Sequence, residues 1–135
     1  MKLAIKTEAW LLNFPQEEIS TYHTIHGGVY TRTIMIKKGV TISGAAIKVP
    51  TTLIFSGNVD ILVGDDVLNL RGYKVVPASK DRKQIITANE DTFLTMVFAT
   101  KATNVEDAEN EFTDEADRLI SRDPSSKNTY ILTGE

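Results

Sequence analysis

About eight short runs rich in β-branched and aromatic residues, separated by turn residues at near-even spacing, fill the middle of the chain. Turn pairs such as Lys38-Gly39 lie between two apolar runs. Short strands at this spacing are typical of a β-sandwich or β-barrel, and 135 residues suit one domain. We therefore predict an all-β domain. The predicted strands are Val29–Lys37, Val40–Val49, Thr51–Ser56, Asn58–Val63, Val67–Leu70, Tyr73–Val76, Gln84–Ala88 and Thr92–Thr100; we also expect a turn at Ser56-Gly57-Asn58.

The segments on either side of the predicted barrel, residues 29–100, have different patterns. Residues 1–28 are predicted to form an N-terminal arm with an apolar group at Trp10, Leu11, Leu12 and Phe14. Residues 123–135 are predicted to be a tail, in which Tyr130-Ile131-Leu132 is either frayed or paired as an edge strand.

Residues 101–122 carry the one helical pattern. Asn104 is a plausible N-cap, and Arg118 and Arg122 lie near the C-terminal end, where the helix dipole favours cations. The spacing predicts one amphipathic helix packed on the barrel. Its apolar positions are Val105, Ala108, Phe112, Ala116, Leu119 and Ile120.

Composition and charge argue against several classes of protein. The chain has no cysteine and a net charge of −3. Seven of its 18 acids lie between residues 106 and 117, which disfavours nucleic-acid binding because phosphate contacts need clustered Lys and Arg. No apolar run is long enough to span a membrane, and the first residues do not read as a signal peptide. We expect a cytoplasmic protein without disulfides.

Three stretches resemble, in this order, a family of small cupin-fold proteins commonly encoded by tailed bacteriophages. They are PQEEISTYHTIHGGVYTRTIMIKKG, the PASKDRK loop and EDTFLTMVFAT. The resemblance implies a cupin double-stranded β-helix, or jelly-roll barrel, that is often oligomeric and acts in the host-cell cytoplasm or as a virion component. The matching positions are Pro15, Gln16, His23, Gly28, Tyr30, Arg32, Gly39, Pro77, Arg82, Glu90, Asp91, Thr92 and Thr100.

Metal-binding positions depart from the pattern that this resemblance implies. Cupins that do chemistry usually present two His and a Glu from a first motif and another His from a later strand. Here the stretch from Gly39 to Gly57 contains no His, Asp or Glu. Arg82 and Phe98 stand where relatives have His, and neither side chain coordinates metal. We expect neither a metal nor another cofactor. The other expected ligand positions fall on or near Ala45, Ile47, Pro50, Thr51 and Thr52.

His23 and His26 are the only histidines. Gly27-Gly28 directly after them favours a loop, and a catalytic zinc site needs a third protein ligand. No Gly-x-Ser-x-Gly elbow or phosphate-binding loop is present. Hydrogen-bonding or surface roles are therefore expected for the histidines.

Basic residues form the remaining candidate site. Arg32 and Lys48 lie on predicted barrel strands, while Lys80, Arg82 and Lys83 share one loop. A barrel mouth ringed by Arg and Lys suits a small anion such as a phosphate or carboxylate. In the plainer interpretation these are solvated charges or partners of nearby acids.

Two functions remain open. The first is a non-catalytic, metal-independent module that acts through self-assembly, with a homodimer favoured, or binds a protein or small anion. The second is a metal-free cupin enzyme of the sugar or sugar-nucleotide isomerase type, with His23 or Tyr30 as acid/base. A polar pocket containing His23 favours the enzyme, whereas an interior filled by apolar side chains favours binding. The candidate ligand-binding residues are Arg82, Lys48, Arg32, Lys80, Tyr30 and His23.

Overall fold

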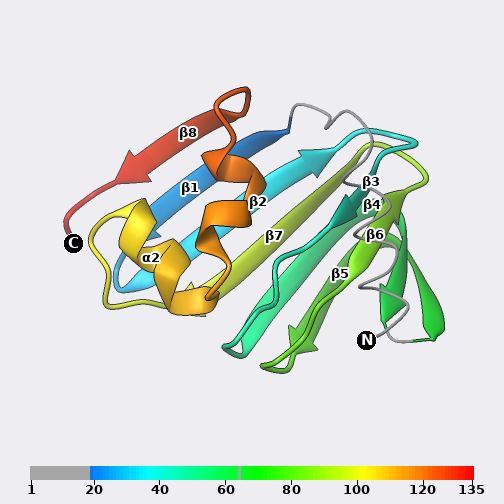
Figure 1. Cartoon of the computed structure of the whole chain (residues 1–135), viewed down its shortest axis with the longest axis horizontal. Coiled ribbons are helices and arrows are strands. Elements are labelled where there is room, and N and C mark those ends of the chain that lie inside the picture. Colours follow the sequence, from blue (N-terminus) through cyan, green and yellow to red (C-terminus); the bar gives the residue numbers. More distant parts are fainter. Residues whose placement is uncertain (1–18, 64) are drawn as a thin grey trace.

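One eight-stranded sheet forms most of the described chain, residues 19–63 and 65–135 of a computed structural model (Figure 1). The strands follow the order β3-β6-β4-β7-β2-β1-β8, with β5 paired to β4. The prediction of an all-β domain is confirmed. The strands are β1 Ser20–His26, β2 Val29–Ile36, β3 Thr41–Ser43, β4 Thr51–Val63, β5 Asp66–Ala78, β6 Ile85–Ala88, β7 Thr92–Ala99 and β8 Lys127–Leu132.

The two longest strands, β4 and β5, each contain a glycine at the same level. Gly57 of β4 and Gly72 of β5 are register partners in an unbroken antiparallel ladder. The predicted turn at Ser56-Gly57-Asn58 is therefore wrong, and four predicted strands are two long ones. At Gly57 the strand changes its second neighbour: residues 52–56 pair with β7, and residues 59–62 pair with β6.

The strand β1 occupies residues that the sequence assigns to the arm. It pairs antiparallel with β2 and parallel with β8. The sheet therefore begins before residue 28, where the sequence placed the start of the barrel. The alternation of Thr21, His23 and Ile25 as buried residues is that of a strand with one face on the core. The apolar group at residues 10–14 lies outside the described residues.

The α-helix α2, Val105–Phe112, covers the inner face of β1, β2 and β7 (Figure 1). Asn104 caps it by accepting a hydrogen bond from the Asp107 amide, as predicted. The helix is shorter than predicted because the residues at its C-terminal end hydrogen-bond to the loop after β3. Lys48 N–H donates to the Phe112 carbonyl, and Thr113 Oγ1 donates to the Ala46 carbonyl. Two 3₁₀ turns follow, η1 Ala116–Arg118 and η2 Ile120–Arg122.

The C-terminal strand β8 pairs with β1, so the edge-strand alternative for residues 130–132 is the one observed.

Between the sheet and α2, the rings of Tyr30, Phe98 and Phe112 pack together, with Phe98 edge-on to both others. No helix in residues 19–63 and 65–135 is long and apolar enough to cross a membrane.

Candidate functional site

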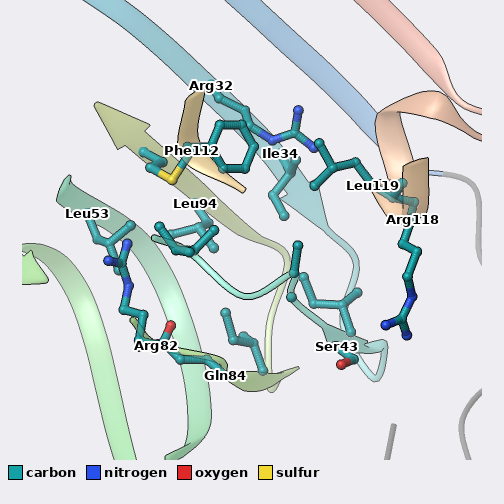
Figure 2. Close-up of a pocket in the computed structure, with 17 residues that line it drawn as sticks. Arg32, Ile34, Ser43, Leu53, Arg82, Gln84, Leu94, Phe112, Arg118 and Leu119 are labelled. Atoms are coloured by element: carbon teal, nitrogen blue, oxygen red, sulfur yellow. The ribbon is translucent and has the colours of Figure 1, made fainter. Parts of the chain in front are cut away.

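A cavity of ≈140 Å³ lies between the inner face of the sheet and the segment that follows α2 (Figure 2). Strands β2, β4, β6 and β7 form its floor, because their inward-facing residues alternate with outward-facing ones. The loop after β3 and the two 3₁₀ turns close its sides. Its walls are mainly apolar and include Ile34, Leu53, Ile86, Leu94, Met96 and Phe112.

The charged residues that line the cavity, within residues 19–63 and 65–135, are all positive. They are Arg32, Arg82 and Arg118, and no Asp or Glu of these ranges lines it. Arg82 and Arg118 lie on opposite sides in the view of Figure 2. A lining that is apolar apart from arginine side chains suits an anion better than a cation.

Arg82 is held by neutral acceptors. Its guanidinium donates to the carbonyl oxygens of Ser79 at 2.5 Å and Val49 at 3.3 Å, and to Thr51 Oγ1. Burial lowers the pKa of Arg82. Within the described residues, none of these hydrogen bonds reaches a carboxylate, so the positive charge of Arg82 is not compensated by an ion pair.

The positive charge of Arg32, by contrast, is compensated by an ion pair with Glu109. Its Nη1 donates at 3.0 Å to both Glu109 Oε2 and Ser121 Oγ, and its guanidinium lies 5.7 Å from the centre of the Phe112 ring. Arg122 Nε donates to the other Glu109 oxygen at 3.0 Å. With Arg32 8% exposed and Glu109 3% exposed, this buried network joins β2 to α2 and η2. It is a structural support for the cavity wall.

Arg118 belongs to a second network, centred on Glu115. The Glu115 carboxylate accepts from the Ala46 amide at 2.7 Å, from Arg118 Nη1 at 2.7 Å and from Lys83 Nζ at 3.3 Å. The Ala46 hydrogen bond, with the help of Lys83 and Arg118, lowers the pKa of Glu115. Glu115 therefore ties the loop after β3 to η1 at the rim of the cavity.

His23 and Tyr30 form a separate buried pair. The Tyr30 hydroxyl and His23 Nδ1 are 2.7 Å apart, and His23 Nε2 is 2.7 Å from Asn128 Oδ1. Because Asn128 Nδ2 donates to the Ser121 carbonyl, Oδ1 faces the imidazole and Nε2 must carry the proton. Nδ1 then accepts from Tyr30 O–H. Burial lowers the pKa of His23 and raises the pKa of Tyr30, so both are neutral near pH 7.

The structure therefore separates the residues that the sequence grouped together. Arg82 and Arg32 line the cavity, whereas Lys48, Lys80, His23 and Tyr30 do not. Lys48 Nζ pairs with Asp114 at 2.6 Å on the surface, and Lys80 is exposed.

Sequence reasoning missed Arg118 as a lining residue. In the sequence its position near the end of a predicted helix indicated a dipole partner, and no local signal placed it beside residues 42–47.

The cavity does not fit a divalent metal ion. Ala45, Ile47 and Arg82, three of the expected cupin ligand positions, do line it, and Ile47 and Arg82 form a β-bridge. None of the three offers a carboxylate or imidazole. In the part of the chain that the structure describes, no group of three or more His, Asp or Glu is placed to hold a metal ion.

Comparisons with known proteins identify the fold. No model of a known protein family and no curated protein matches the chain. A cupin-2 domain containing protein from Shewanella frigidimarina is 12% identical, with 73% of this chain and 98% of that chain covered and a TM-score of 0.50.

A cupin superfamily protein from Desulfitobacterium hafniense is also 12% identical, with 65% of this chain and 84% of that chain covered and a TM-score of 0.50. Salicylate 1,2-dioxygenase from Pseudoaminobacter salicylatoxidans is 7% identical, with 71% of this chain and 30% of that chain covered and a TM-score of 0.53. At these identities the likeness concerns the fold alone. The chain has the cupin jelly-roll fold, which confirms the predicted fold class.

Proposed function

We propose that this chain is a non-catalytic, metal-independent cupin module that binds a small anion with an apolar body. The observation that carries the proposal is the cavity between the sheet and the segment that follows α2, whose walls are mainly apolar and whose charged lining residues, among those that the structure describes, are all arginines. A carboxylate at the rim would accept charge-assisted hydrogen bonds from Arg82, which has no acidic partner among the described residues.

The cavity volume limits the ligand. A protein cavity of about 150 Å³ accommodates benzene, so ≈140 Å³ suits one ring or a short branched chain. We therefore propose small monocarboxylates, such as benzoate or 3-methylbutanoate, as the ligand class. Nucleotides are too large to be enclosed there.

Thermal unfolding in the presence of benzoate tests the proposal. A ligand at 100 times its dissociation constant stabilises by about 2.7 kcal/mol, so benzoate should raise the melting temperature, and neutral benzamide should raise it less. Arg82→Gln should remove most of the benzoate effect. Lys80→Gln is the matched control, because it removes a positive charge from the same loop but not from the cavity.

Two results would reject this ligand class. One is equal stabilisation by benzoate and benzamide, which would show that the arginines play no part. The other is a benzoate effect that survives both Arg82→Gln and Ala45→Phe, the second of which fills the cavity.

The alternative of a metal-free isomerase needs an acid/base side chain at the bound ligand. The proposal assigns no catalytic residue, because His23 and Tyr30 are absent from the cavity lining and are hydrogen-bonded to each other and, through His23 Nε2, to Asn128. The proposed origin from a tailed bacteriophage, and with it a location in the host-cell cytoplasm or virion, rests on the ordered sequence resemblance.

A further inference from the structure

On the face of the sheet opposite α2, three adjacent rows of residues carry no charged side chain. Register partners share a face, so Val75, Ile54, Thr95, Thr33 and Tyr22 form one row from β5 to β1. We call this row and the two rows beside it the outer face.

The neighbouring rows have the same character. One contains Tyr73, Ser56, Phe93 and Met35. The other contains Pro77, Thr52, Val97, Thr31 and Thr24. None of these residues is Asp, Glu, Lys, Arg or His. The solvent side of an antiparallel sheet usually carries polar and charged residues, so the absence of charge from these rows requires an explanation.

The outer face ends at the Gly57–Gly72 pair. In the two rows directly beyond this pair, the outward residues of the same two strands are Asn58 with Arg71 and Asp60 with Asn69, and the next outward pair is Leu62 with Val67. Asn69 Nδ2 donates to Asn58 Oδ1 at 3.0 Å and to Asp60 Oδ1 at 2.8 Å. One pair of strands thus changes from an uncharged to a solvated polar surface at one level, which indicates a bounded contact surface.

Large apolar side chains on the outer face are exposed. Tyr22, Phe93, Val75 and Tyr73 are 45%, 48%, 56% and 69% exposed. With strands ~4.8 Å apart and same-face residues ~6.8 Å apart, the three rows span a flat area of roughly 500 Å². This flat area is more than half of the ~800 Å² that each partner buries in a stable interface.

We propose that the outer face is the dimer interface and that its occupant is a second copy of this chain, related by a two-fold axis. Two uncharged faces are complementary to each other, whereas a charged partner would find no counter-charge there. The acidic α2 segment lies on the opposite side of the sheet (Figure 1). Face-to-face docking therefore places the two acidic segments at the outside of the dimer, where their repulsion is smallest.

Sedimentation of the full chain at micromolar concentration, with a matched pair of variants, tests the proposal. The wild type should sediment at twice its 15.0 kDa chain mass. Val75→Arg introduces a charge inside the outer face and should weaken the dimer at least tenfold. Val67→Arg introduces the same charge on the outward side of the same strand, at 65% exposure, but beyond the glycine pair, and should leave the dimer intact.

Phe93→Arg, on a different strand of the outer face, should reproduce the effect of Val75→Arg, and melting curves establish that each variant is folded. A monomeric wild type overturns the proposal, and that result would leave another occupant, such as residues 1–18 of the same chain. Equal behaviour of Val75→Arg and Val67→Arg, whether both dimeric or both monomeric, also overturns it.

Discussion

A Cβ atom on Gly57 would lie 2.3 Å from the Oγ1 atom of Thr92, closer than any real contact. Thr92 is fully buried and fixed, because its hydroxyl accepts from the Asn58 amide at 3.1 Å and donates to the Glu90 carbonyl at 2.9 Å. Gly57 also has a positive φ of 146°. The point where β4 passes from β7 to β6 therefore requires glycine.

Gly57→Ala should lower the free energy of unfolding by about 1–3 kcal/mol through overpacking, in addition to backbone strain. Gly72→Ala is the control, since its φ is also positive, at 76°, but nothing lies within 4 Å of an added Cβ. Chemical denaturation should show the larger loss for Gly57→Ala. Equal losses would mean that the contact with Thr92 relaxes without cost.

Glu109→Leu should destabilise the protein by about 3–5 kcal/mol, because it leaves Arg32 buried without its carboxylate. The double variant Arg32→Met/Glu109→Leu should recover part of that loss in urea denaturation. Asp114→Ala, which removes only the exposed pair with Lys48, should cost less than about 1 kcal/mol. A double variant no more stable than Glu109→Leu would contradict the role given to Arg32.

Stability should fall as the pH drops below about 6.5. Burial lowers the pKa of His23, so the unfolded chain binds a proton at a higher pH than the folded chain does. The contribution of neutral His23 is therefore complete above its unfolded pKa of 6.5 and is lost as the pH falls toward the folded pKa.

His23→Phe should remove this dependence and cost about 1–3 kcal/mol at pH 8, where two hydrogen bonds are lost. His26→Gln, which changes the exposed histidine, should keep the slope. Unfolding curves between pH 5 and 8 measure both effects, and a slope that persists in His23→Phe would show that another group titrates.

Chelators should leave the melting temperature unchanged, and elemental analysis after mild dialysis should show no stoichiometric zinc, iron, manganese or nickel. The reason is that the described residues lining the cavity include no imidazole or carboxylate. A structural metal would instead contribute several kcal/mol to folding, so a fall in melting temperature with EDTA would refute the prediction.

Local patterns predicted the strands and the Asn104 cap because alternation and capping depend on neighbouring residues. The continuity of β4 was not predictable, since the backbone freedom of Gly57 serves a turn and a strand junction equally well. β1 was missed because the inward position of His23 depends on Tyr30 and on Asn128, 105 residues away. The helix ends at Phe112 because a distant loop binds its terminal carbonyl.

The candidate site follows the same division. The sequence showed that Arg82 stands where relatives have His, and Arg82 lines the cavity. The pairing of Arg32 with Glu109, and the approach of Arg118 to the loop after β3, are consequences of packing between segments far apart in the chain.

The parallel pairing of β1 with β8 has a consequence for synthesis. The hydrogen bond between His23 and Asn128 can form only after Asn128 has been made, 105 residues after His23. At 5–20 residues per second this is a delay of about 5–20 s. During that time one edge of β1 has no partner strand and the imidazole has only one of its two hydrogen bonds. An unpaired strand edge is a template for pairing with other chains, so β1 is open to aggregation until β8 has been made.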